Sequence, residues 1–299
     1  MSRQTLLLLM ASILTILVIA VVVKAIQPAP DRTTQHILEY GAEYTGDARP
    51  TLRILMIGNS HLRRGAIASK VAELANSDSD ACPYHLITGF YGQDGAMLID
   101  HWNRTRAKAA LTEGEWDRLL LQDASWSTIF PAAKFDETTR NWIELARAHN
   151  VEPALITTWA RDNSNPMYSA VPVFNADRNL MQGVVTRRHA DTAATLGIGT
   201  VPVGPAWRLA WSNSDLPTLF HRDGNHTNTL SQWLTALTIY HYLCEQPDRM
   251  PASVLPEEVT PHAPIIWAAV LGARGQERKS VENPSEIDAL ALSATKALQ

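Results

Sequence analysis

The sequence predicts an α/β fold of three layers, in which a central parallel sheet of about five strands lies between helices. Short apolar runs of strand length alternate along the chain with longer segments of helical spacing. Because a crossover between parallel strands usually contains a helix, this alternation is typical of a sheet that helices cover on both faces. The chain has 299 residues, a length that suits one large domain, which we assign to residues 51–250.

The expected elements follow from these patterns in chain order. The expected strands are Leu52–Ile57, Tyr84–Tyr91, Arg118–Gln122, Ala154–Thr158 and Thr200–Val203. The expected helices, which contain good helix formers, are Ala66–Ala75, Arg104–Leu111, Thr138–Ala148, Asn175–Leu196 and Asn228–Leu243. Open sheets of this type bind ligands at the carboxyl ends of their strands, so the residues directly after each strand are the first candidates for a site.

Residues 1–26 are predicted to be a signal anchor or a signal peptide. The stretch Thr5–Val23 carries no charge and is long enough for one helix to cross about 30 Å of hydrocarbon. Arg3 precedes it, and positive charge on this side favours a domain outside the cytoplasm, either periplasmic or extracellular. A membrane is therefore an expected partner, unless cleavage after the small-x-small sequence Val23-Lys24-Ala25 releases a secreted protein.

The flanking segments and the composition narrow the possibilities further. Residues 27–50 are polar and bounded by prolines, which predicts a linker, and residues 251–299 are expected to pack on the domain or trail from it. The net charge is -4 without a long run of either sign, so nucleic acid is not an expected partner. Cys82 and Cys244 belong to no CxxC or Cys/His cluster, which argues against structural zinc, and the sequence leaves open whether they pair.

Ser60 follows the first expected strand, within Gly58-Asn59-Ser60-His61. A serine in the turn after a strand is well placed to act as a nucleophile, because the positive end of the next helix and its own N–H can stabilise an oxyanion. The alternative is that Ser60 only caps the next helix, which is a common role for serine.

A nucleophilic serine needs a base, and the base needs a carboxylate that orients it. Asp223-Gly224-Asn225-His226 lies just before the last expected helix. Its Asp and His are three positions apart in a turn-like loop, where carboxylate and imidazole can lie side by side. The alternative is an ordinary Asx turn formed by Asp223 and Asn225.

Together these motifs resemble the SGNH (GDSL-type) hydrolases, over roughly Arg53 to Leu243. In that family the nucleophilic serine follows a Gly-Asp or Gly-Asn pair and the last block is Asp-x-x-His, which Gly58-Asn59-Ser60 and Asp223-x-x-His226 match. The resemblance implies a catalytic triad of these Ser, His and Asp side chains, an acyl-enzyme and no cofactor. It also implies that the N–H groups of the serine and of a second-block glycine hold the oxyanion; Gly95 fits that glycine, with Gly92 as the alternative.

The remaining block departs from the family pattern. After the third expected strand the family usually has Gly-x-Asn-Asp, whereas this chain reads Leu121-Gln122-Asp123 without an asparagine. Gln122 is the expected substitute in the oxyanion hole, because its side-chain N–H can donate; Gln122→Ala is then expected to lower kcat about 100- to 1000-fold with little effect on folding. A branch of the family is similar here, with a strand-end Gln and a Leu-x-x-His-Trp sequence, which Leu98 to Trp102 match.

Several residues near the expected strand ends are candidates for substrate binding: Asn59, His61, Trp102, Trp126 and Trp159. Tryptophan faces could stack on sugar rings, or they could fill the boundary between loops and core. His61 and His101 are weaker candidates for the base, because neither has a carboxylate spaced as well as Asp223. No HExxH or similar pair predicts a metal site.

The expected function is that of an esterase for small acyl esters, with acetyl groups on carbohydrates as the leading substrates. No motif specifies this substrate, which rests on the predicted location, the tryptophans and the family resemblance. Two alternatives stay open. An O-acyltransferase could pass the acyl group to an envelope glycan through the same triad, and a catalytically inactive, anchored sugar-binding module could keep the fold alone.

Overall fold

The computed structural model describes residues 38–42, 46–129, 132–245 and 248–274. At its centre is a six-stranded sheet with the order β1-β3-β2-β4-β5-β6. All neighbouring strands are parallel except β1 and β3, which are antiparallel. The strands are β1 (Leu38–Tyr40), β2 (Thr51–Gly58), β3 (His85–Gly92), β4 (Arg118–Leu121), β5 (Glu152–Ile156) and β6 (Gly199–Val201).

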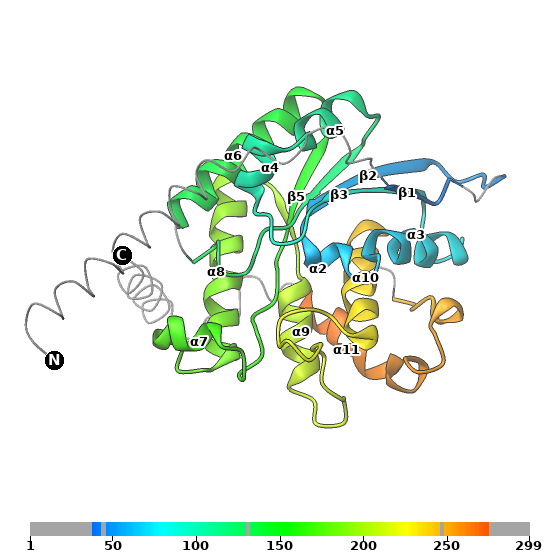
Figure 1. Ribbon diagram of the computed structural model, residues 1–299. Helices are drawn as coiled ribbons and strands as arrows, with labels where there is room; N and C mark the ends of the chain where they lie inside the picture. The colour runs from blue at the N-terminus through cyan, green and yellow to red at the C-terminus, as the bar shows by residue number, and fades with distance from the viewer. Residues whose placement is uncertain (1–37, 43–45, 130–131, 246–247, 275–299) are drawn as a thin grey trace, which may run out of the picture. The chain divides into compact units, whose positions relative to one another are not determined.

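Helices cover both faces of the sheet, as Figure 1 shows. One face carries α3 (Ile67–Ser77), α9 (Val203–Trp211), α10 (Thr229–Leu243) and α11 (Ala263–Ala273), and the other carries α4 (Leu98–Arg104), α5 (Ala107–Glu113) and α6 (Ala132–Ala148). The remaining helices are α2 (Ser60–Arg63), α7 (Met167–Ala170) and α8 (Arg178–Leu196), and short 3-10 turns are formed by Pro172–Phe174, Ala252–Val254 and Thr260–His262. The predicted α/β architecture is therefore confirmed.

Successive side chains of β2 point to opposite faces of the sheet, and both faces are buried. Ile54 and Met56 belong to the hydrophobic cluster that includes α3 and α10, whereas Leu55 and Ile57 belong to the cluster that includes α5 and α6. None of the four has exposed surface. This double burial explains why the strand is an uninterrupted apolar run in the sequence.

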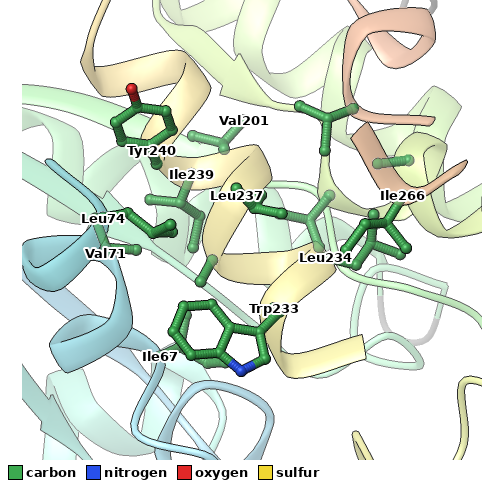
Figure 2. Packing of buried hydrophobic residues seen from close by; sticks show 14 of the residues in the cluster. Ile67, Val71, Leu74, Val201, Trp233, Leu234, Leu237, Ile239, Tyr240 and Ile266 are labelled. Atoms are coloured by element: carbon green, nitrogen blue, oxygen red, sulfur yellow. The ribbon is translucent and has the colours of Figure 1, made fainter. Parts of the chain in front are cut away.

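Helix α10 lies at the centre of the larger cluster, as Figure 2 shows. Its Leu234 and Leu237 have no exposed surface and pack among apolar side chains from α3 and α11. The side chain of Asn228 caps the helix by accepting a hydrogen bond from the N–H of Ser231, at 3.1 Å. Because the Asp223–His226 segment lies just before this cap, the packing of α10 helps to fix its position.

The strands expected from the apolar runs are all present, and the structure adds one more. Leu38–Tyr40 lies in the segment for which composition predicts a linker, yet it forms the antiparallel edge strand β1. Three residues are too few to give a periodic signal. Helix α11, within residues 251–299, packs on the domain; it was not expected because its sequence is apolar on nearly all sides and has no amphipathic pattern.

Cys82 and Cys244 form a disulfide, which answers a question that the sequence leaves open. The bond joins the segment before β3 to the C-terminal end of α10, across a sequence separation of 162. It therefore ties α10, the helix that follows the Asp223–His226 segment, to the chain just before β3.

Two predicted segments lie outside the described residues. They are the signal anchor or signal peptide, residues 1–26, and residues 275–299 of the C-terminal extension. Within the part of the chain that the structure describes, no helix is both long enough and apolar enough to cross a membrane. The anchor therefore stays a prediction from the sequence.

Candidate active site

Ser60 is the first residue of α2 and lies at the carboxyl end of β2, with 6% of its surface exposed. The side chain of Asn59 caps this helix by accepting a hydrogen bond from the N–H of His61, at 3.1 Å. The N–H of Ser60 donates no hydrogen bond to another described residue, so it can donate to a ligand. The helix has only four residues, so the electrostatic support expected from its positive end is small.

The side chains of Ser60, His226 and Asp223 form a hydrogen-bonded line. The Nε2 atom of His226 lies 2.8 Å from the Oγ of Ser60, and its Nδ1 atom lies 2.7 Å from Oδ2 of Asp223. Since a carboxylate accepts the Nδ1 hydrogen, the lone pair of Nε2 faces the serine hydroxyl. Partial burial raises the pKa of Asp223, but hydrogen bonds from His226 and Asn225 outweigh this and hold the pKa well below its usual range.

Backbone contacts fix the loop that carries Asp223. The N–H of Asp162, in the loop after β5, donates to the carbonyl of Gly224 at 2.8 Å, and Nδ2 of Asn165 donates to the carbonyl of Asp223 at 2.9 Å. Gly224 has φ +63°, and a Cβ atom there would lie 3.2 Å from the Cβ of Asp162. The loops after β5 and before α10 are therefore joined directly beside the candidate triad.

His61 is close to the triad but is not arranged as a base. Its Nε2 donates to Oδ1 of Asn225 at 3.1 Å, and its Nδ1 lies 3.2 Å from the Oγ1 of Thr158, from which it can accept. Burial lowers the pKa of His61 to about 3, so the ring is neutral. His61 therefore orients the side chain of Asn225, which is next to His226 in the sequence. This contact agrees better with a positioning role than with proton transfer.

His101, the other alternative base, supports the sheet instead. Its Nε2 donates to the carbonyl of Gly58 at 2.8 Å, and the residue has no exposed surface. Burial lowers its pKa. Among the described residues, no group of three or more His, Cys, Asp or Glu side chains is arranged to hold a metal ion.

The three candidate tryptophans lie in different environments. Trp159 is 1% exposed and stacks between His61 and Trp207, at centroid distances of 4.4 Å and 4.3 Å, so its faces are already covered. Trp102 packs edge-to-face on a buried tryptophan of α6, in the hydrophobic cluster on that side of the sheet. Trp126, after β4, is 38% exposed and is the one of the three with a large accessible surface. Trp159 therefore fills the boundary between loops and core, which is the second of the two expected roles, and partly buried Trp102 packs on the cluster in the same way.

Gly95 and Gly92 differ in their suitability as oxyanion donors. Gly92 is the last residue of β3 and pairs with Gly58 in the sheet. Gly95 lies beyond the sheet, in a turn with φ +73°, and its N–H donates no hydrogen bond to another described residue. This geometry favours Gly95 over Gly92 as a donor to a ligand.

The amide of Gln122 has a different use from the one expected. Its Oε1 accepts from the N–H of Asn59 at 3.0 Å, and its Nε2 donates to the carbonyl of Asp123 at 2.5 Å. Asn59 also donates from its side chain to the carbonyl of Ala96 at 3.0 Å. Gln122 and Asn59 are 1% and 3% exposed. Both candidate residues therefore hold the segments around Ser60 and Gly95 together, and their polar atoms are occupied by protein partners.

The sequence did not indicate a group of charged residues that lies beside the triad. Arg63 forms an ion pair with Asp94, with Nε at 2.6 Å from Oδ1. The guanidinium of Arg64 also contacts Asp94, at 3.4 Å, and its Nη1 lies 3.9 Å from Oδ2 of Asp223. The two arginines directly follow the serine block and could have drawn attention, but the direction of long side chains on a short helix cannot be inferred from sequence.

No protein-family model and no curated protein matches the sequence. Solved structures do match its fold. A DUF4886 family protein from Bacteroides uniformis has a TM-score of 0.63 and 19% identity, with 75% of this chain and 94% of that chain covered. A candidate SGNH hydrolase from Slackia heliotrinireducens has a TM-score of 0.54 and 23% identity, over 64% of this chain and 98% of that chain. The chain has the SGNH hydrolase fold.

A third solved structure with a similar fold is that of a carbohydrate esterase. A variant of an acetyl xylan esterase from Geobacillus stearothermophilus has a TM-score of 0.51 and 13% identity, over 67% of this chain and 99% of that chain. At such identities the likeness establishes the shared fold and not a shared substrate. The chemistry of this chain therefore depends on its own residues and not on the fold alone.

Proposed function

We propose that this chain is a serine esterase that forms an acyl-enzyme at Ser60. The observation that carries the proposal is the hydrogen-bonded line from Asp223 through His226 to Ser60. The SGNH hydrolase fold supports it, because the line lies at the carboxyl ends of the strands, where open α/β sheets bind their ligands. An intact line of this kind argues against an inactive sugar-binding module.

The proposed reaction begins when Oγ of Ser60 attacks the ester carbonyl and His226 takes the hydroxyl proton at Nε2. Negative charge then develops on the carbonyl oxygen, for which the N–H groups of Ser60 and Gly95 are the proposed donors. When the tetrahedral intermediate collapses, the C–O bond to the alcohol breaks and His226 gives its proton to the leaving oxygen. Water then attacks the acyl-enzyme with His226 as the base, which releases the acid and restores the serine.

Acetyl esters of carbohydrates are the proposed substrates, and the proposed location is outside the cytoplasm. The likeness to an acetyl xylan esterase supports the first, at the level of fold. The Cys82–Cys244 disulfide supports the second, because disulfides persist in oxidising compartments. Residues 1–26, as a signal anchor, would hold the domain at a membrane.

A fluorophosphonate probe tests the nucleophile directly, since it forms a covalent bond with an activated serine. The probe should label the parent protein and Ser212→Ala, whose serine lies at the exposed end of α9, but not Ser60→Ala. Circular dichroism and thermal unfolding show whether each protein is folded. Absence of labelling in a folded parent protein would refute the proposal, and so would labelling that survives in Ser60→Ala.

An ester assay with and without an added oligosaccharide separates hydrolysis from transfer. With 4-nitrophenyl acetate as the donor, an esterase releases acetate in both cases. Appearance of an acetylated oligosaccharide, with a matching fall in free acetate, would assign the chain to the O-acyltransferases instead.

A further inference from the structure

Arg161 lies in the loop after β5, beside the loop that carries the candidate base. The hydrogen bonds that Asp162 and Asn165 donate to the Asp223–His226 segment join these two loops. The Arg161 side chain is partly buried, and Trp159, two positions earlier in the chain, packs on His61. Arg161 therefore belongs to the loop that is joined to the segment carrying Asp223 and His226.

The guanidinium of Arg161 forms no ion pair with a carboxylate of the described residues. Its Nε atom is fully buried and makes no hydrogen bond with them. The carboxylate of the adjacent Asp162 forms an ion pair with Arg178, whose Nη1 lies 3.2 Å from Oδ2 of Asp162. The carboxylate of Asp223 accepts hydrogen bonds from the backbone and ring of His226. Both nearby carboxylates are thus committed elsewhere, whereas guanidinium groups in protein interiors are normally paired.

Arg161 is also within electrostatic reach of the triad. Burial is the main cause that lowers the pKa of His61 to about 3, and the charge of Arg161 adds to it. Burial lowers the pKa of Arg161 itself, while the charge of Asp223 acts in the opposite direction. An anion that binds Arg161 would therefore lie close to the reacting groups.

The position of Arg161 indicates which half of an ester it would contact. In the proposed reaction His226 gives its proton to the leaving alcohol, so the alcohol half lies on the imidazole side. We propose that Arg161 binds a carboxylate on the alcohol half of the substrate, which makes the chain selective for acyl esters of acidic alcohols such as acidic sugars. This inference rests on the proposed esterase function. A planar guanidinium can bind a carboxylate through two parallel hydrogen bonds.

Two aryl acetates that differ only in charge test the inference. The substrates are 4-acetoxybenzoate, whose leaving group carries a carboxylate, and 4-acetoxybenzamide, whose leaving group is neutral. The measured quantity is the ratio of their kcat/KM values, compared between proteins so that the intrinsic reactivities cancel. Arg161→Gln should lower this ratio about tenfold or more, mainly through a higher KM for the benzoate. Arg161→Lys should retain part of the preference, because it keeps the charge but loses the planar fork.

Arg222→Gln is the matched control, because Arg222 is exposed and lies next to Asp223 in the sequence. It should leave the ratio unchanged. Equal ratios in the parent protein and in folded Arg161→Gln would overturn the inference, as would an equal fall in Arg222→Gln, which would indicate a diffuse charge effect. If the folded parent protein hydrolyses neither ester and takes no fluorophosphonate label, the proposed function itself fails. If it hydrolyses both without dependence on Arg161, only the carboxylate preference fails.

Discussion

The Nε2 atom of His226 lies 2.8 Å from the Oγ of Ser60, although 166 positions separate the two residues in the sequence. The contact depends on two supports. The close fit of β2 in the sheet places Ser60, and the packed helix α10 together with the loop after β5 places His226. Substitutions in β2, in α10 or in the loop after β5 can therefore change catalysis without altering a triad residue. Stability and activity have to be measured together for this reason.

Asp223→Asn should separate orientation of the base from folding of its loop. The asparagine keeps an oxygen for the backbone N–H groups of Asn225 and His226 but can present an NH2 group to Nδ1 of His226. Two donors then face each other, and the ring adopts the tautomer that cannot accept the Ser60 proton. We expect kcat to fall by about 10⁴ while thermal unfolding changes little. A variant that retains parent activity would remove Asp223 from the proposed triad.

Gln122→Ala should lower stability, in contrast to the effect expected from sequence. The change removes the acceptor for the buried N–H of Asn59 and leaves that group unpaired. An unsatisfied buried donor costs about 1–3 kcal/mol, which should appear as a lower free energy of unfolding in urea. A fall in kcat with unchanged stability would instead favour Gln122 as an oxyanion donor.

The disulfide should contribute measurably to stability. Replacing Cys82 and Cys244 together by serine opens a loop with a sequence separation of 162, and long loops gain the most from closure. We expect the free energy of unfolding to fall by about 2–5 kcal/mol. Reduction of the parent protein should cause a loss of similar size, measured by urea unfolding with and without dithiothreitol. If reduction has no effect on the parent protein, the bond is not a stabilising element.

Two buried histidines should make stability depend on pH. Burial lowers the pKa of His61 to about 3 and that of His189 to about 4, below the ordinary value of 6.5. Below about pH 6.5 the unfolded chain binds protons that the folded chain does not, so the free energy of unfolding should fall as pH drops from 6.5 towards 4. His189→Leu should remove part of this slope, up to about 1.4 kcal/mol per pH unit.

Asp123 gives the opposite slope in the same range. Burial raises the pKa of its carboxyl to about 6, so the folded chain binds the extra proton and this residue favours folding at lower pH. The contribution is the same in the parent protein and in His189→Leu, so the difference between their urea unfolding curves isolates His189. Identical pH dependence in the two proteins would show that His189 is not a source of the slope.

The sheet could be predicted because its strands are buried on both faces. Runs such as Leu52–Ile57 are recognisable because they are apolar without interruption. Ser60 at the end of the first strand and Asp223-x-x-His226 before the last expected helix are combined into one site through the family resemblance. Short or wholly buried elements could not be predicted. Leu38–Tyr40 is too short for a period, and α11 is apolar on nearly all sides, so neither has the pattern that reveals an element.

Side-chain partners were the least predictable part of the site. Gln122 and Trp159 follow strands, as ligand-binding residues do, but the structure uses one for backbone hydrogen bonds and the other for a stack between two rings. A sequence position at a strand end indicates the neighbourhood of a residue and not the direction of its side chain. The unpaired cation of Arg161 becomes visible only when the partners of the surrounding carboxylates are known.

The disulfide between Cys82 and Cys244 determines what happens to the protein after a single proteolytic cut. A single cut in the exposed loop 212–218 would place Ser60 on one fragment and His226 on the other, yet the fragments would remain one covalent molecule. A nicked chain would therefore migrate intact on a non-reducing gel and fall apart only when the sample is reduced. In surroundings rich in secreted peptidases, such a molecule keeps both halves of its reactive centre in a single particle.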